Sequence, residues 1–238
     1  ERRRRTARHC PGALLEMTTE VAGRGELVRS DTRRPSDIRV DLRLIADMIT
    51  PASRVLDIGC GDGQLLRYLV QSRNVVGRGI ELSQAGVNAS VAQGLSVVQG
   101  DADSDLGNYP DKAFDYVVLS QTLQATRNPR QVVSELVRIG RKAIISFPNF
   151  GYWRVRWKLL TQGRMPRTGA LDHEWHETPN IHLCTILDFT DLCARLGAKV
   201  ERRVSFTASG RTSVLQSSLH LANLFGEQAV FVVSRPER

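Results

Sequence analysis

Hydrophobic positions along residues 40–147 follow two alternating patterns, one typical of amphipathic helices and one typical of buried strands. Apolar residues at helical spacing, followed by Pro51, predict a helix over residues 41–49. Further helices are expected at residues 64–71, at residues 83–93 with Ser83 as the cap, and between Pro129 and Gly140. Short runs that are mostly apolar predict strands buried on both faces, at residues 54–58, 74–80, 95–99, 114–120 and 142–147.

One more helix and two more strands are expected beyond residue 147. The helix covers residues 186–196 and is ended by Gly197, and the strands cover residues 199–206 and 227–234. These last two strands, joined by a connection of about 20 residues, are expected to pair antiparallel at one edge. We therefore predict an α/β fold, a doubly wound, mostly parallel seven-strand Rossmann-like sheet with helices on both faces.

The first 37 residues differ in composition from the rest of the chain. Residues 1–39 hold ten arginines against six acidic residues, with no aromatic residue among them. We interpret residues 1–37 as a disordered, Arg-rich N-terminal extension and residues 38–238 as the folded domain. The alternative is an arm that binds nucleic acid or an anionic surface. Nucleic-acid binding is the weaker interpretation, because no aromatic side chain is present to stack on bases.

Composition also bears on the compartment. No apolar run approaches the roughly 18 residues that a membrane-spanning helix needs. The four cysteines stand at positions 10, 60, 184 and 193 and form no CxxC pair. This usage favours reduced thiols rather than a disulfide framework. We therefore predict a cytoplasmic protein that does not contact a membrane.

A glycine-rich turn follows the first predicted strand, with the pattern Asp57-x-Gly59-x-Gly61-x-Gly63. Open α/β sheets bind nucleotides at this place, where glycine permits close approach of a ligand. Gln64 stands where the dinucleotide pattern would have its third glycine. A tight turn of this kind suits a cofactor with an adenosine and an amino-acid end better than one with a pyrophosphate.

Acidic residues stand at the ends of three successive predicted strands. Asp57 lies in the end of the first strand, Glu81 follows the second and Asp101 follows the third. Glu81 is placed to accept both hydroxyls of a ribose. Asp101 is placed to accept an adenine amino group, while Ala102 offers its backbone N–H. Single acids at such places are often turn formers or helix caps, but three on one rim favour a nucleoside site.

Four segments together resemble the successive motifs of class I S-adenosylmethionine-dependent methyltransferases. They are VLDIGCGDG at 55–63, GIELS at 79–83, QGDA at 99–102 and FDYVV at 114–118. The resemblance implies the class I methyltransferase type of sheet and S-adenosyl-L-methionine or S-adenosyl-L-homocysteine as cofactor. The cofactor contacts that we expect on this basis are Asp57, Gly59, Cys60, Gly61, Gly63, Glu81, Leu82, Asp101, Ala102 and Ser120.

A closer resemblance, over about residues 38–234, is to the MetW family of methionine biosynthesis proteins. It is carried by RVDLRLI at 39–45, LSQTLQAT at 119–126, SFPNFG at 146–151, TPNIH at 178–182 and NLFGEQ at 223–228. This resemblance implies a partner of homoserine O-acyltransferase (MetX), whose cofactor pocket senses the end product of the pathway. Polar pocket contacts are expected at Gln121, Gln124 and His182.

Methyl transfer itself is the alternative function, but the residues that follow the fourth predicted strand argue against it. Many small-molecule methyltransferases carry histidines after the fourth strand, but Gln121 and Ala125 occupy those places. Glutamine and threonine side chains can form hydrogen bonds but do not abstract a proton near neutral pH. We therefore assign no catalytic residue, and an active methyltransferase acting on a small molecule remains the second interpretation.

Two further clusters have more than one interpretation. Residues 152–167 interleave aromatic and basic side chains and contain no acid. They predict either a partner-docking surface or a helix whose apolar side packs over the sheet. His173, His176 and His182 have borderline spacing for a metal site, and no cysteine stands at ligand spacing to them. We expect no metal. Cys60 is interpreted as a small packing residue rather than a reactive thiol.

Overall fold

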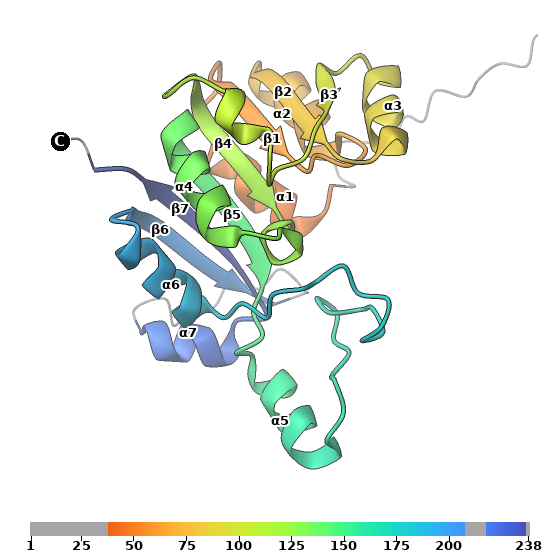
Figure 1. Cartoon of the computed structure of the whole chain (residues 1–238), viewed down its shortest axis with the longest axis vertical. Coiled ribbons are helices and arrows are strands. Elements are labelled where there is room, and N and C mark those ends of the chain that lie inside the picture. The colour runs from red at the N-terminus through yellow and green to blue at the C-terminus, as the bar shows by residue number, and fades with distance from the viewer. Residues whose placement is uncertain (1–37, 208–217, 237–238) are drawn as a thin grey trace, which may run out of the picture. The chain divides into compact units, whose positions relative to one another are not determined.

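The strands form one seven-stranded sheet in the order β3-β2-β1-β4-β5-β7-β6 (Figure 1), in a computed structural model that describes residues 38–207 and 218–236. Strands β1 to β5 run parallel, and β7 pairs antiparallel with both β5 and β6. The strands are β1 (Arg54–Ile58), β2 (Val76–Glu81), β3 (Val97–Gln99), β4 (Phe114–Ser120), β5 (Gly140–Pro148), β6 (Lys199–Phe206) and β7 (Gln228–Ser234). The predicted N-terminal extension, residues 1–37, lies outside the described residues.

Helices cover both faces of this sheet, as the doubly wound prediction requires. On one face, Val118 of β4 and Ile144 of β5 pack in one cluster with Ile45 of α1 and Leu69 of α2. The helices are α1 (Val40–Asp47), α2 (Gln64–Arg73), α3 (Gln84–Ala92), α4 (Pro129–Ile139), α5 (Trp153–Gln162), α6 (Ile186–Arg195) and α7 (Leu219–Phe225).

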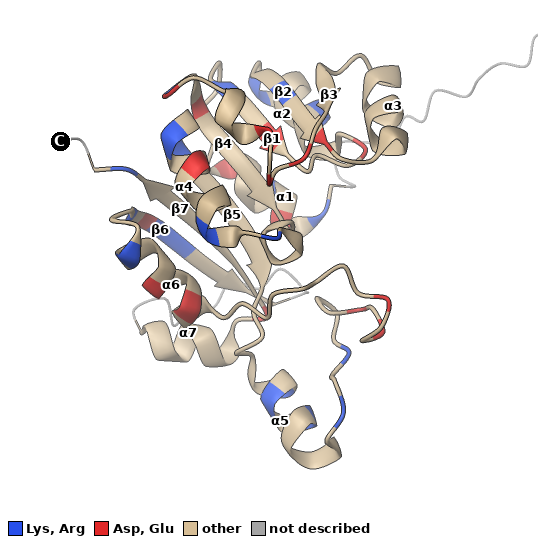
Figure 2. Ribbon diagram, in the orientation of Figure 1, with Lys and Arg blue, Asp and Glu red and all other residues tan. Residues whose placement is uncertain are grey.

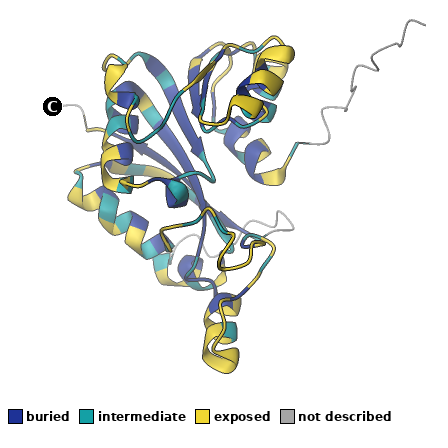
Figure 3. Ribbon diagram, turned by 45° about the vertical axis from the view of Figure 1, so that its right-hand side comes forward, coloured by how far each residue is buried: buried dark blue, intermediate teal, exposed yellow. Residues whose placement is uncertain are grey.

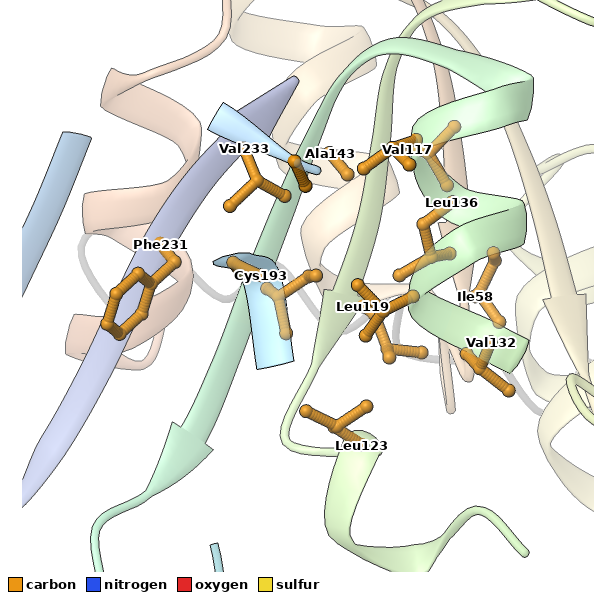
Figure 4. Packing of buried hydrophobic residues seen from close by; sticks show 14 of the residues in the cluster. Ile58, Val117, Leu119, Leu123, Val132, Leu136, Ala143, Cys193, Phe231 and Val233 are labelled. Carbon is orange, nitrogen blue, oxygen red and sulfur yellow. The ribbon is translucent and has the colours of Figure 1, made fainter. Parts of the chain in front are cut away.

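The larger cluster fills the opposite face, beneath α4 and α6. There Val117 and Leu119 of β4 alternate in direction with Val118 and pack against Leu136 of α4 (Figure 4). Cys193 of α6 joins the same cluster beside Phe231 of β7. Alternate residues of β4 therefore fill two different cores, which explains why this strand is apolar along nearly its whole length.

Most predicted elements are confirmed, but several boundaries were wrong. Helix α2 continues to Arg73, and Asn74 then ends it with a left-handed backbone (φ 53°, ψ 38°), so β2 begins at Val76 rather than at residue 74. Strand β3 begins at Val97 rather than at residue 95. The connection between the last two strands contains a helix, α7, that was not predicted from the sequence.

Between β5 and α6 the chain leaves the sheet and forms an excursion, here called the α5 arm (residues 150–183). The interpretation that its helix packs over the sheet is wrong. Val155 is the buried residue of α5, and it packs with Tyr152 and Leu171 in a small cluster separate from the cores of the sheet. Figures 1 and 3 show α5 standing away from the sheet, with most of its length exposed.

A buried asparagine fixes the base of the α5 arm. The Asn149 side chain donates to the carbonyl oxygens of Asn223 (2.8 Å) and Gly226 (2.7 Å). Its Oδ1 accepts from the backbone N–H groups of Gly151 (3.0 Å) and Ile186 (3.2 Å). The end of β5, the start of α6 and the end of α7 are thereby joined at one point.

Candidate functional site

A cavity of about 340 Å³ opens at the carboxyl ends of β1, β2, β3 and β4. This is the place where open α/β sheets bind ligands, and the volume lies within the range of small-molecule pockets. The lining comes from the ends of these strands, the loops that follow them and one residue of the α5 arm: Ile58, Gly59, Ile80, Glu81, Leu82, Gly100, Asp101, Ala102, Asp103, Gln121, Thr122, Ala125, Thr126, Arg127 and Pro179.

The glycine-rich turn after β1 is held to the end of β2. The N–H groups of Gly59 (2.8 Å) and Cys60 (3.2 Å) both donate to the carbonyl oxygen of Ile80. Gly59, Gly61 and Gly63 all have positive φ, of 70°, 57° and 77°. Residues that carry a Cβ rarely adopt this backbone conformation, so the turn requires glycine at each of the three positions.

The surroundings of the three glycines differ. A Cβ at Gly63 would clash with a methyl carbon of Leu95, and one at Gly59 would lie 2.7 Å from the Thr122 hydroxyl oxygen. These two glycines are therefore also required by the packing of the protein itself. At Gly61 no atom lies within 4 Å of the place of a Cβ. Gly61 is the glycine of the turn that leaves open space beside the backbone.

Glu81 ties the turn to the start of α3. Its Oε2 accepts from the N–H of Gly61 and its Oε1 from the N–H of Ser83, both at 2.8 Å. These bonds fix the carboxylate while it lines the cavity, and each oxygen keeps a lone pair for a further donor. The residue thus has both a structural role and free capacity to accept hydrogen bonds from a ligand.

Asp101 is joined to the loop after β4. One carboxylate oxygen accepts from the Asp103 N–H (2.9 Å), and the other accepts from the Arg127 guanidinium (2.8 Å). Asp103 in turn accepts from the backbone N–H groups of Arg127 (2.8 Å) and Asn128 (2.9 Å). Asp101, which is predicted to contact an adenine, therefore also forms an ion pair with the exposed Arg127 at the wall of the cavity.

Asp57 and Cys60 are buried beside the turn. Asp57 is 2% exposed, and the described residues provide no hydrogen-bond donor to its carboxylate. Burial, with a smaller contribution from the charge of Glu81, raises the pKa of Asp57 to about 7. Burial, with smaller contributions from the charges of Asp57 and Glu81, raises the pKa of the Cys60 thiol to about 12. Cys60 is therefore a neutral packing residue in contact with Leu66 and Val97 rather than a nucleophile.

The three polar residues predicted to contact the ligand lie at different depths. Gln121 lines the cavity and has a left-handed backbone (φ 53°), with its N–H donating to the Ser146 carbonyl (3.0 Å). The Gln124 side chain is buried and donates to the Gln121 carbonyl (2.8 Å). The His182 side chain is exposed, and its backbone N–H donates to the Gln124 carbonyl (3.0 Å).

The structure therefore divides the predicted contacts into two sets. One set lines the cavity: Gly59, Glu81, Leu82, Asp101, Ala102 and Gln121. The other set lies near the same strand ends but outside the lining: Asp57, Cys60, Gly61, Gly63, Ser120, Gln124 and His182. Asp103, Arg127 and Pro179 also line the cavity and were not predicted from the sequence. Asp103 stands two positions after Asp101, which is the one local signal that could have indicated it.

The groups of the described lining that could accept a proton are carboxylates that are already hydrogen-bonded. These carboxylates are Glu81, Asp101 and Asp103, and each accepts one or more backbone N–H groups. Histidine, lysine, tyrosine and cysteine do not occur among the described lining residues. The cavity can hold a polar ligand with hydroxyl, amino and cationic groups, and the acceptors in its described lining are carboxylates engaged with backbone N–H groups rather than a histidine or a lysine.

Comparisons with known proteins agree with this geometry. The sequence profile of the family described as methionine biosynthesis protein MetW matches residues 39–233. A curated relative, the bifunctional methionine biosynthesis protein MetXA/MetW of Rhodopirellula baltica, is 37% identical over 206 residues, which cover 79% of this chain and 33% of that protein. Ajmaline N-methyltransferase of Rauvolfia serpentina is 30% identical over 93 residues, covering 36% of this chain and 31% of that enzyme. The chain spans about a third of the length of these curated relatives.

Solved structures show the same fold. An S-adenosylmethionine-dependent methyltransferase from Mesorhizobium loti matches with a TM-score of 0.61 at 16% identity, over 85% of this chain and 100% of that one. The [4+2]-cyclase SpnF matches with a TM-score of 0.58 at 17% identity, over 83% of this chain and 81% of that one. Among the described residues, no helix is both long and apolar enough to cross a bilayer.

Proposed function

The chain belongs to the MetW family of methionine biosynthesis proteins, and from this premise we propose that it binds S-adenosylmethionine or S-adenosylhomocysteine and acts on homoserine O-acyltransferase (MetX) as its partner and activator. One observation carries the proposal. The cavity brings together acidic and backbone groups suited to a nucleoside, yet the carboxylates of its described walls are already bonded to backbone N–H groups, and no histidine, lysine, tyrosine or cysteine lines it. The bifunctional relative supports the choice of partner, because its name assigns a MetXA part and a MetW part to one polypeptide.

The residues present fit such a ligand. Glu81 would accept the ribose hydroxyls, and Asp101 with the Ala102 N–H would meet the adenine. The open side of the turn at Gly61 would admit the amino-acid end, and the buried Asp57 would meet its ammonium group. When bound, S-adenosylmethionine supplies an electrophilic methyl group. The chain itself supplies binding and orientation, and a ligand that binds one conformation of the chain more tightly than another would shift the population toward it.

Calorimetric titration with S-adenosylhomocysteine tests the ligand. We expect saturable binding to the unmutated chain, weakened by about 1–3 kcal/mol in Glu81→Ala, since the variant loses a charged acceptor. Glu201→Ala is the matched control, because that carboxylate pairs with Lys142 (2.7 Å) and does not line the cavity. Equal losses in the two variants, or no binding to the unmutated chain, would contradict the assignment.

Co-expression with the acyltransferase tests the partner. The two proteins are expected to elute as one complex in size-exclusion chromatography, and acylation of homoserine is expected to increase when this chain is added to the purified enzyme. The active methyltransferase remains the second candidate, favoured by the likeness of the fold to S-adenosylmethionine-dependent methyltransferases. Separate elution, together with transfer of a labelled methyl group to a metabolite extract, would favour that candidate over the partner. The SpnF match shows that this fold also occurs in a protein named for a different reaction.

A further inference from the structure

The α5 arm exposes several large apolar side chains to solvent. All three tryptophans of the chain lie in it, at positions 153, 157 and 175. They are 41%, 60% and 73% exposed, and Leu160 is 80% exposed. Tryptophan is rarely this accessible in a protein without a partner, and it is enriched at the centres of protein interfaces. Figure 3 shows α5 as an almost wholly exposed helix.

Charge on the α5 arm is segregated along its length. Every charged residue in 151–170 is basic, and the acidic residues begin at Asp172. Figure 2 shows the basic positions on α5 and on the segment that follows it, with the acidic positions on the returning segment. One ion pair, Arg167–Glu174 (2.6 Å), joins the two halves. On α5 the exposed Trp153, Trp157 and Leu160 stand at helical spacing among basic residues, which fits a partner face whose apolar centre is surrounded by acidic side chains.

The returning segment of the same arm forms part of the cavity wall. Pro179 lines the cavity, and two residues later the backbone N–H groups of Ile181 (2.9 Å) and His182 (3.0 Å) donate to the Gln124 carbonyl. Gln124 in turn donates to the carbonyl of Gln121, another lining residue. A series of hydrogen bonds therefore connects Gln121 at the cavity, through Gln124, to residues 181 and 182 of the α5 arm.

We propose that the α5 arm is the docking surface for the acyltransferase and that its returning segment carries the state of the cavity to that surface. The inference rests on the proposed function for the identity of the partner. The occupant is the acyltransferase because the bifunctional relative places it in the same polypeptide, with two thirds of that protein lying outside the match to this chain. A second copy of this chain and other proteins are outcomes that the test distinguishes.

The docking test measures the dissociation constant of the full chain and the purified acyltransferase. Trp157→Ala is expected to raise it about 30-fold, the effect of losing one buried aromatic anchor. Val91→Ala, an exposed position on α3, is the control and is expected to leave it unchanged. A complex that forms with the same affinity in both variants would overturn the docking site but not the partnership. Self-association that Trp157→Ala abolishes, with no effect on the acyltransferase, would assign the surface to a second copy and overturn the proposal.

Tryptophan emission tests the link to the cavity without the partner. Because all three tryptophans lie in the α5 arm, the emission reports on this segment alone. Titration with S-adenosylhomocysteine is expected to shift the emission with the dissociation constant found by calorimetry. Heat of binding with unchanged emission would show that the cavity and the arm are independent and would overturn this part of the proposal. Absence of heat would instead count against the proposed ligand.

Discussion

Replacing Asn149 by alanine is expected to lower the free energy of unfolding by about 3–5 kcal/mol. The side chain is 1% exposed and bonds to two backbone carbonyl oxygens and two backbone N–H groups. Alanine leaves most of these groups buried without a partner, and each such group costs about 1–3 kcal/mol. Urea unfolding followed by far-ultraviolet circular dichroism measures the change.

A second asparagine provides the control for this prediction. Asn88 lies exposed on α3, where its Oδ1 accepts from Gln84 (2.9 Å). Asn88→Ala is expected to change the unfolding free energy by no more than about 0.5 kcal/mol. If Asn149→Ala also cost less than about 1 kcal/mol, the asparagine would not be what holds the base of the α5 arm.

Asp57→Asn is expected to stabilise the protein by up to about 4 kcal/mol at pH 8 and to have little effect at pH 4. Burial raises the pKa of Asp57 from 3.8 to about 7, so the folded state holds this proton more tightly than the unfolded state does. The stability that the protonated group contributes is complete below about pH 4 and is lost as the pH rises through 7. Asparagine does not ionise, so the difference between the two proteins isolates this change.

Asp115 is a control of opposite sign. The Arg54 guanidinium beside it lowers the pKa of Asp115, so its ionised form favours the folded state. Asp115→Asn is expected to destabilise the protein above about pH 4, where Asp57→Asn stabilises it. Chemical unfolding between pH 4 and pH 8 compares the variants. A stability difference between Asp57→Asn and the unmutated chain that is independent of pH would show that Asp57 titrates normally.

The same titration bears on the proposed ligand. A cationic ligand beside Asp57 favours the ionised carboxylate, so the affinity for S-adenosylmethionine is expected to increase between pH 6 and pH 8. In Asp57→Asn this increase is expected to disappear. The buried acid would then reduce the stability of the free protein at neutral pH while strengthening its attraction for a positively charged ligand.

The sheet could be predicted from the sequence because its signals are local. Strands β1, β4 and β6 begin and end where the hydrophobic pattern places them. The start of β2 was wrong because α2 continues to Arg73 and is ended there by the left-handed conformation of Asn74, which the hydrophobic pattern does not indicate. Helix α7 was missed because it has only seven residues, too few for a clear helical period.

The site could be predicted only in part, for a different reason. Glu81 and Asp101 could be predicted because each follows a parallel strand, and the carboxyl ends of neighbouring parallel strands meet at one edge of the sheet. Arg127 and Pro179 reach the same cavity from segments that are placed by tertiary contacts, such as the bond from the Ile181 N–H to the Gln124 carbonyl. Asn149 stands in a segment that resembles the MetW family, yet its contacts in the structure are with backbone groups rather than with the cavity.

The position of β7 between β5 and β6 has a consequence for the order of folding. Strand β6 is made before β7, but within the described sheet its hydrogen-bonded neighbour is β7. Strand β6 therefore cannot join the sheet until β7 has paired with β5. Until then the unpaired edge of β5 can form hydrogen bonds with strands of other chains. Pairing of β5 with β7 joins segments far apart in sequence, which makes it a slow step. During synthesis, aggregation through the edge of β5 is thus a hazard in the interval between the emergence of β5 and that of β7.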